Sequence, residues 1–460
     1  MELAAHVEDR SPRGIAAAIA RLVRSGELRP GDRLPTVREL AAELAVSPAT
    51  VSGAWQALSA VGLVVSRGRA GTYVLPEPAG WLPPSYRDLA GEPAPGATRT
   101  RAPRLDLSTG TPDPTLLPAL GPALARVAAR MPAADTDTYV SSPTIPALEA
   151  LLRASWPFVP ARITVVDGAM DALGRTLEQV AGFGDRVAVE DPGFPPVFDL
   201  VEQLGLERIP VPIDRHGMRP DALAAALRAG AGVVVLQPRA HNPTGVSLTS
   251  TRARELAAVV RRLGTERDVL VIEDDHSGEI SSARPVSLGT WLPGRVVHVR
   301  SFSKSHGPDL RIAAVGGPAP VLDRLVARRM LGPAWTSRLL QHVLVDLLTD
   351  GAALDSIAEA RRAYYARQRA LCVALAGHGL SVQPGDGINL WVPVHDESTA
   401  LVRLAAAGIR VAPGGPFQAR ADQPAPTTPG RPGGHVRVTV ALLRDDVAAV
   451  ARLLALAAAP

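Results

Sequence analysis

The sequence predicts an α/β protein in two parts: a small N-terminal winged helix–turn–helix domain and a large domain built on a mostly parallel sheet. Three observations lead to this prediction. Short amphipathic helices fill residues 1–76, prolines crowd residues 77–104, and short β-rich runs alternate with helical patterns over residues 105–460. A chain of 460 residues has room for about three domains, or for one small and one large domain.

The composition is that of a folded protein without membrane or secretory segments. Hydrophobic residues make up 46% and charged residues 20% of the chain, which are ordinary values. The first ten residues lack the apolar core of a secretory signal, and the longest apolar run, Val447–Pro460, is interrupted by Arg452. The single cysteine, Cys372, excludes an internal disulfide. We expect a cytoplasmic protein with no bound metal and no membrane partner.

Lysine is almost absent from the chain. Lysine and arginine together number 49, yet Lys304 is the only lysine. Arginine replaces a surface lysine at little cost, but it cannot replace a lysine whose amine must lose its proton and form a covalent imine. The pattern therefore favours a chemical role for Lys304, with chance survival as the alternative.

Three helices are expected in residues 1–76. The first places Ile15, Ile19 and Leu22 on one face. The second follows a capping-box pattern that starts at Thr36, and the third follows Ser47, which is suited to cap a helix.

Two β-rich runs, Leu63–Val65 and Thr72–Val74, then flank a basic turn with Arg67 and Arg69. A helix–turn–helix followed by such a hairpin is typical of winged-helix DNA readers, and the two arginines suit phosphate or the minor groove. The outward face of the third helix carries small and polar residues suited to a DNA groove: Ala49, Thr50, Ser52, Gly53 and Gln56. The alternative is an ordinary amphipathic bundle, because the net charge of +4 is small.

Residues 77–104 contain six prolines and three glycines. Such a segment does not continue a helix or a central strand, and we interpret it as a semi-rigid linker. The strand candidates beyond it are Val165–Asp167, Arg186–Glu190, Gly232–Gln237, Val269–Glu273 and Val296–Arg300. Helical stretches such as Ala169–Val180 and Thr251–Leu263 separate them, and ligands of such sheets bind at the carboxyl ends of the strands.

The segment that follows the last of these strands carries Lys304. Two hydroxyl groups, Ser301 and Ser303, precede it, and Arg311 lies seven residues beyond it. An amine with hydroxyls and a guanidinium nearby suits an aldehyde that bears a phosphate. A solvated loop lysine is the alternative.

Three further strand ends carry polar or small residues. Asp274 lies in a run of three acids, which is costly to bury unless a cation such as a protonated pyridine nitrogen is present. Asn242, in a His-Asn-Pro-Thr-Gly run, has an amide that can donate to a phenolate. Gly168, Ala169 and Met170 open a helix whose first N–H groups can approach an anion. A solvated acidic turn and a plain turn are the alternatives for the first two.

The run from Leu28 to Val74 resembles the winged-helix domain of GntR-type bacterial repressors. The matching positions are Leu34, Pro35, Arg38, Leu40, Ala41, Ser47, Thr50 and Val51. The arginine usual after the serine is Pro48 here. The resemblance implies binding to a double-stranded DNA operator, with contacts from Arg38, Ser47, Ala49, Thr50, Arg67 and Arg69.

Residues 105–455, with the motifs above in this order, resemble the fold-type I aminotransferases that use pyridoxal 5′-phosphate (PLP). The resemblance implies a smaller C-terminal α+β subdomain. It implies that Lys304 bonds covalently to PLP, that Asp274 pairs with the ring nitrogen and that Asn242 contacts the phenolic oxygen. The implied residues around the phosphate are Gly168, Ala169, Met170, Ser301, Ser303 and Arg311.

Four other positions follow from the same resemblance. Phe194 would lie against the ring, with a core phenylalanine as the alternative, and Arg437 would take a substrate carboxylate. Tyr139 would reach a phosphate across a dimer interface. His276 stands where the family usually has a tyrosine, a departure that bears on turnover more than on cofactor binding.

From end to end the chain looks like the MocR/GabR subfamily of GntR regulators. That implies a PLP-dependent transcriptional regulator, a domain-swapped homodimer, whose aminotransferase-like domain senses an amine, an amino acid or PLP itself. One alternative is an active aminotransferase that carries a DNA-binding module, which would convert its cofactor to the amine form with amino acids. A degenerate domain without PLP is a third possibility, which the retained Lys304 disfavours.

Overall fold

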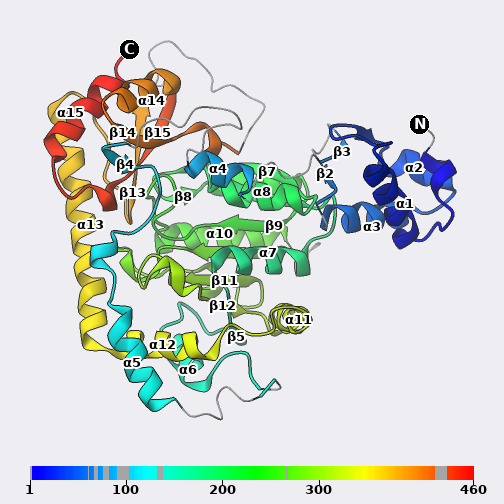
Figure 1. Cartoon of the computed structure of the whole chain (residues 1–460), viewed down its shortest axis with the longest axis horizontal. Coiled ribbons are helices and arrows are strands. Elements are labelled where there is room, and N and C mark those ends of the chain that lie inside the picture. The colour runs from blue at the N-terminus through cyan, green and yellow to red at the C-terminus, as the bar shows by residue number, and fades with distance from the viewer. Residues whose placement is uncertain are drawn as a thin grey trace.

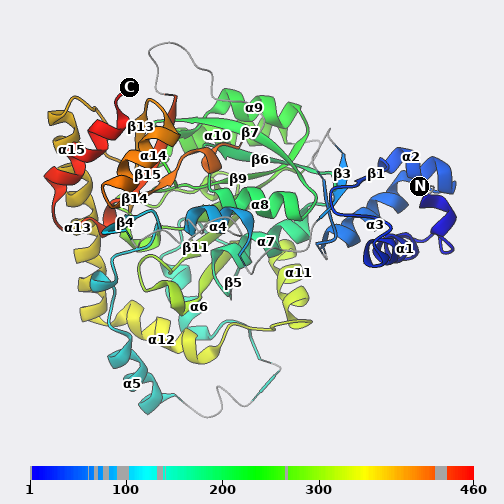
Figure 2. The ribbon, with the colours of Figure 1, turned by 45° about the horizontal axis from the view of Figure 1, so that its top comes forward.

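The computed structural model describes residues 3–60, 62–66, 71–75, 82–90, 103–131, 138–139, 141–264, 268–419 and 433–460. A small N-terminal domain stands to one side of a much larger body, and a long helix runs along the opposite side of that body (Figure 1). Turning the molecule shows the central sheet between its helices and a second, smaller sheet beside it (Figure 2). The predicted fold class is confirmed.

The N-terminal domain is a three-helix bundle with a three-stranded wing. Its elements are α1 (Pro12–Ser25), β1 (Arg33–Leu34), α2 (Val37–Leu44), α3 (Pro48–Ala60), β2 (Val64–Ser66) and β3 (Thr72–Val74), with strand order β1-β3-β2. The capping box is present: Glu39 N–H donates to Thr36 Oγ1 at 3.2 Å, and Thr36 N–H donates to Glu39 Oε2 at 2.7 Å. Strand β1 was not predicted, because two residues carry no alternation signal.

Eight strands form the central sheet of the large domain, in the order β5-β12-β11-β10-β9-β6-β7-β8. Their bounds are β5 (Arg162–Val166), β6 (Arg186–Asp191), β7 (Glu207–Asp214), β8 (Gly217–Met218), β9 (Ala231–Leu236), β10 (Leu270–Asp275), β11 (Val296–Ser301) and β12 (Ala313–Gly317). The run from β11 to β7 is parallel, whereas β12 and β8 are antiparallel to their neighbours. All five predicted strands are present with slightly shifted ends.

Helices cover both faces of this sheet because consecutive strand residues point to opposite sides. On one face, α7 (Ala169–Val180), α8 (Pro195–Gln203) and α11 (Ala319–Met330) pack against a core that includes Val235 and Ile272. On the other face, α9 (Pro220–Arg228) and α10 (Ser250–Leu263) pack against a core that includes Val234 and Val271. Near β5 and β12 lie α5 (Leu120–Arg130), α6 (Pro146–Ala154) and α12 (Arg338–Thr349).

The C-terminal subdomain has its own four-stranded sheet, in the order β13-β15-β14-β4. Its elements are β4 (Leu105–Leu107), β13 (Asn389–Val394), α14 (Glu397–Ala406), β14 (Ile409–Pro413), β15 (Gly434–Thr439) and α15 (Val447–Ala458). The long helix α13 (Gly351–Gly377) joins it to the central body. Strand β4 comes from the start of the large domain and pairs with β14 in parallel.

The proposed linker contains a helix that the sequence analysis did not predict. Within residues 77–104 the structure has a helix, α4 (Pro84–Ala90), whose first position is a proline that needs no N–H partner there. This helix is docked on the large domain, since Ser85 N–H donates to Asp199 Oδ2 at 2.9 Å. None of the helices in the described part of the chain is long and apolar enough to span a membrane.

Candidate functional site

Lys304 lies just beyond the carboxyl end of β11, in the same edge region as the ends of β6, β9 and β10. Its Nζ donates to the carbonyl oxygen of Gly110 at 2.6 Å. Burial, together with the charge of Arg437, lowers the pKa of the amine to about 8, against the opposing charge of Asp274. A lysine amine with this pKa is partly neutral near physiological pH and is therefore a competent nucleophile.

Asp274 lies in β10, only 2% exposed. Its Oδ2 accepts a hydrogen bond from Gln237 Nε2 at 2.9 Å, whereas its Oδ1 has no partner among the described residues. Burial raises the pKa of this carboxyl group. An orphaned buried carboxylate oxygen is costly unless a ligand supplies a donor or a positive charge.

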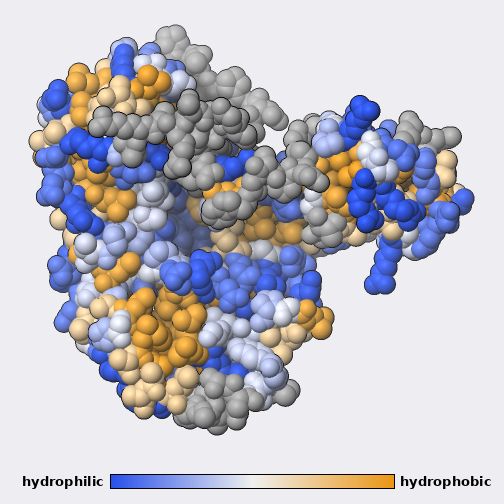
Figure 3. Space-filling model, in the orientation of Figure 1, coloured by the Kyte–Doolittle hydropathy of each residue, from blue (hydrophilic) through white to orange (hydrophobic). Residues whose placement is uncertain are grey.

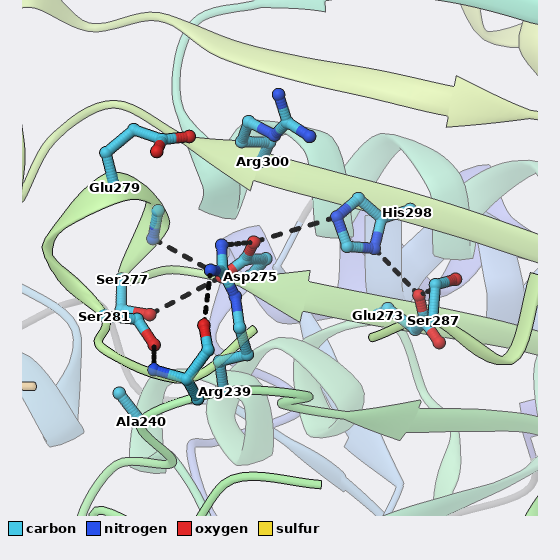
Figure 4. Close-up of polar contacts among 12 residues, drawn as sticks. Arg239, Ala240, Glu273, Asp275, Ser277, Glu279, Ser281, Ser287, His298 and Arg300 are labelled. Carbon is cyan, nitrogen blue, oxygen red and sulfur yellow. Dashed lines mark hydrogen bonds and ion pairs between the residues drawn. The ribbon is translucent and has the colours of Figure 1, made fainter. Parts of the chain in front are cut away.

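The two acids beside Asp274 have protein partners instead (Figure 4). Glu273 Oε2 accepts from His298 Nδ1 at 2.8 Å, and Asp275 Oδ2 forms an ion pair with Arg239 at 2.5 Å. Burial opposes ionisation of Asp275, but the nearby Arg239 and His298 outweigh it and lower the pKa. Of the three acids, Asp274 is thus the one with a carboxylate oxygen left for a ligand.

A small-residue cradle lies at the start of α7. Gly168 has φ +106°, and a Cβ atom at this position would lie 2.5 Å from an Arg311 guanidinium nitrogen. Arg311 also donates to the carbonyl oxygen of Asp167 at 2.8 Å, and no side chain caps the helix that Ala169 and Met170 begin. Helix N-terminus and guanidinium together form a site suited to a phosphate.

The two serines predicted near this cradle lie at and just beyond the end of β11, which β12 separates from β5. Ser301 is the last residue of β11 and pairs with Ala313, which pairs in turn with Val166 of β5. Ser301 Oγ accepts from the N–H of Ser303 at 3.3 Å. The sheet register therefore places Ser301 level with Val166, at the same edge of the sheet as Gly168 but two strands away from β5.

Arg437 and Asn242 meet on the other side of the site. Arg437 is 1% exposed, and its guanidinium donates to Asn242 Oδ1 at 3.3 Å and to the carbonyl oxygen of Ser108. The central carbon of this guanidinium lies 5.1 Å from the centroid of the Phe417 ring. Burial lowers the pKa of Arg437 to about 10, so a carboxylate that neutralised it would be bound favourably.

Phe194 and His276 complete the predicted set in this region. Phe194 precedes the first turn of α8 and lines a small pocket together with Glu190, Gln237 and Asp274. His276 Nε2 donates to the carbonyl oxygen of Ala240 at 2.9 Å. Burial and the charge of Lys304 lower the pKa of His276, although Asp274 opposes the shift.

Tyr139 lies exposed on the surface, unlike the buried side chains of the site described above. It is 82% exposed, and its ring centroid lies 6.0 Å from that of Trp335. Its proposed contact across a dimer interface stays a prediction.

Of the predicted DNA-reading residues, those in the described part of the chain lie on the surface of the small domain. Arg38, Ser47 and Ala49 are exposed, and Thr50 is half-buried with its Oγ1 2.9 Å from Ser47 Oγ. The wing residues Arg67 and Arg69 lie outside the described residues.

Sequence reasoning missed two side chains of the site, Gln237 and Glu190. Both stand at the carboxyl ends of strands that the sequence did predict, and both are buried. A polar residue at such a position was the available signal, but neither belongs to a recognisable motif.

Both parts of the chain match known protein families. The family "Aminotransferase class I and II" matches residues 103–453, and "Bacterial regulatory proteins, gntR family" matches residues 12–74. The vitamin B6 salvage pathway transcriptional repressor PtsJ of Salmonella typhimurium is 37% identical over 96% of each chain. The HTH-type transcriptional regulator TauR of Rhodobacter capsulatus is 32% identical over 85% of this chain and 86% of that one.

A solved structure supports the fold of the large domain. The α-aminoadipate aminotransferase LysN of Thermus thermophilus superposes with a TM-score of 0.66 at 23% identity, covering 77% of this chain and 91% of that one.

Proposed function

The chain belongs to the GntR-type transcriptional regulators whose DNA-binding domain is fused to a class I and II aminotransferase domain, and we propose that its large domain senses a small molecule through bound PLP. The observation that carries the proposal is the site itself: the only lysine of the chain, Lys304, lies in one pocket region with the orphaned Oδ1 of Asp274. A chain that had lost its cofactor would have no need for either.

The residues fit PLP. Asp274 Oδ1 would hold the ring nitrogen, the cradle at Gly168 and Arg311 would hold the phosphate, and Lys304 would supply the covalent bond. When bound, PLP supplies an electrophilic carbon and an electron-accepting ring. Asn242, His276 and Phe194 would complete the contacts to the ring.

The effector we propose is PLP itself or an amine or amino acid that reacts at the same site. The similarity to a protein named as a vitamin B6 salvage pathway transcriptional repressor supports PLP as the effector. The buried Arg437 supports a carboxylate-bearing amine. The two candidate effectors make different predictions: a response to a carboxylate-bearing amine requires Arg437, whereas a response to PLP alone does not.

Helix α8 offers a direct route from this site to the DNA-binding domain. It starts at the pocket, next to Phe194, and its last residue, Gln203, accepts a hydrogen bond from Ser59 Oγ of α3 at 2.7 Å. Phe183, in the loop before β6, packs against the core of the N-terminal domain. We propose that a shift at the pocket end of α8 changes how α3 is presented to DNA.

We also propose that the chain is divided into domains at residues 1–76, 77–104 and 105–460.

We further propose that the chain forms a homodimer. Exposed apolar side chains near the α11–α12 junction support a homodimer, among them Tyr139 and Leu331, each 82% exposed. Cysteines at Ser59 and Gln203 would test domain swapping: a disulfide between chains supports a swapped arrangement, and one within a chain contradicts it.

The test of the regulatory function is DNA affinity with and without ligands. Operator DNA would be selected from a random pool with the full-length protein, and its affinity measured by fluorescence anisotropy for apoprotein, PLP-loaded protein and PLP-loaded protein with a panel of amines and amino acids. A ligand that changes the affinity supports a sensor.

The second candidate function is an active aminotransferase, which the intact Lys304, Asp274 and Arg437 favour. Conversion of the cofactor to its amine form by amino acids, with no ligand effect on DNA affinity, would support that reading over a sensor.

A further inference from the structure

Gln237 follows the last residue of β9 and is 6% exposed. Its side chain touches two residues of the proposed cofactor site. Nε2 lies 2.9 Å from Asp274 Oδ2, and Oε1 lies 2.8 Å from the backbone nitrogen of Asn242.

The orientation of this side-chain amide is fixed by chemistry. A backbone N–H can only donate, so the Gln237 atom that faces Asn242 N must be the oxygen. The NH₂ group therefore faces Asp274, and Oδ2 of that carboxylate must accept. A proton on Asp274 consequently has one position left, Oδ1, the atom without a partner among the described residues.

The same side chain also constrains Asn242. Its backbone nitrogen is held by Gln237, while its Oδ1 faces donors on Arg437 at 3.3 Å and Asn389 at 3.5 Å. With the oxygen engaged, the NH₂ group of Asn242 is the part left to donate to a ligand.

We propose that Gln237 is the positioning residue that aligns both polar contacts of the PLP ring, the acid at its nitrogen and the amide at its phenolic oxygen. This rests on the proposed function, since it presumes PLP in the site. Gln237 itself touches Asp274 and Asn242 rather than the reacting atoms.

A second acid is held by the backbone of the same residue. Gln237 N–H donates to Glu190 Oε2 at 2.8 Å, and Glu190 Oε1 has no partner among the described residues. Burial raises the pKa of Glu190 to about 8, so near neutral pH it is mostly protonated and adds little negative charge beside Asp274. The other groups that act on Asp274 are His276, Asp275 and His298.

Two variants remove the side-chain amide. Gln237→Met and Gln237→Leu each remove both side-chain hydrogen bonds, to Asp274 and to Asn242, with an apolar side chain of similar or slightly smaller size. The matched control is Gln341→Met, because Gln341 is also buried with three side-chain hydrogen bonds, at 2.9, 2.9 and 2.7 Å, none of them to Asp274 or Asn242.

The measurements are the Kd for PLP, from absorbance titration of full-length apoprotein, and the ¹⁵N shift of PLP labelled at the ring nitrogen. Loss of a hydrogen bond to a charged group predicts an affinity weaker by about 10- to 100-fold in both Gln237 variants. Without its donor, the Asp274 carboxylate holds a proton more tightly, so the ring nitrogen signal should move toward the unprotonated form. Gln341→Met should leave both values at those of the wild type.

The outcomes are distinguishable. Wild-type protein that fails to bind PLP overturns the proposed function. Wild-type protein that binds PLP, with Gln237→Met or Gln237→Leu matching it in Kd and ¹⁵N shift, overturns the role of Gln237. Thermal unfolding of the apoproteins identifies a variant that has lost its fold, and Gln237→Leu decides the matter if Gln237→Met does not fold.

Discussion

Under the proposed function, the cofactor chemistry depends on Lys304. We expect purified PLP-loaded protein to be yellow, and Lys304→Ala to lose the absorbance band of the covalent bond. Lys304→Arg should lose it as well, because a guanidinium stays protonated and does not form the bond. Absorbance spectra after reconstitution provide the measurement, with near-wild-type circular dichroism as the control for folding. A colourless wild type would contradict the assignment.

The lowered pKa of Lys304 makes a prediction about pH. The neutral amine is the reactive form, and with a pKa of about 8 its fraction rises as the pH rises and levels off above that value. The rate of PLP capture should therefore increase about tenfold from pH 6 to pH 7 and flatten above pH 8, whereas an ordinary lysine with a pKa near 10.4 keeps gaining beyond pH 9. Stopped-flow absorbance, with N-acetyl-lysine amide as the comparison, measures this. Parallel profiles for both amines would refute the shift.

Arg437 distinguishes the classes of effector. Arg437→Ala should leave PLP binding and DNA binding in place but abolish the response to amines that carry a carboxylate, because we propose the buried guanidinium as their counter-charge. DNA affinity with and without each amine provides the readout. Arg444→Ala, which removes a guanidinium that pairs with Asp113 instead, is the control. If PLP alone is the effector, the two variants will respond alike.

At the scale of single elements, we expect α2 and α3 to make the contacts with DNA. Arg38 lies on α2, and Thr50 lies in the first turn of α3. Arg38→Ala and Thr50→Ala should each weaken operator binding by about 1–3 kcal/mol if they contact base edges, and should not change the PLP spectrum.

Arg24→Ala is the matched control for that experiment, since Arg24 is an exposed arginine of α1. Affinities must be compared at one salt concentration, because phosphate contacts make binding strongly salt-dependent. Equal affinity of the Arg38, Thr50 and Arg24 variants would place the reading face elsewhere.

At the scale of the whole molecule, the contact between α8 and the N-terminal domain predicts coupling. Effector and DNA binding must influence each other by the same factor, typically about 5- to 150-fold. Phe183→Ala, which removes the aromatic ring packed on the winged-helix core, should reduce this factor toward one while PLP affinity stays the same. Tyr365→Ala, a half-exposed aromatic on α13 at the far side of the body (Figure 1), should leave it unchanged. Full coupling in Phe183→Ala would exclude this route.

Apolar surface gathers on the lower part of the large body, whereas the small domain shows hydrophilic and apolar residues side by side on the face in view (Figure 3). The apolar surface of the large body suits the proposed contact with a second copy of the chain.

The sequence by itself determined the two-part plan, the caps at Thr36 and Ser47, and the strands whose ends carry Lys304, Asp274 and Asn242. These features are local: capping depends on residues three positions apart, and a buried parallel strand is a short apolar run. Helix α4 was not predicted, because the prolines of residues 77–104 indicated a linker and its own helical pattern is short.

Only the tertiary structure decided which polar groups of the site are satisfied. Glu273, Asp274 and Asp275 are adjacent in sequence, yet His298 engages the first and Arg239 the last of them. Among the described residues, Oδ1 of Asp274 is left without a partner. Gln237 and the contact between Ser59 and Gln203 likewise join elements far apart in the chain. Hydrogen-bond partners depend on distance in space, which neighbouring residues in a sequence do not encode.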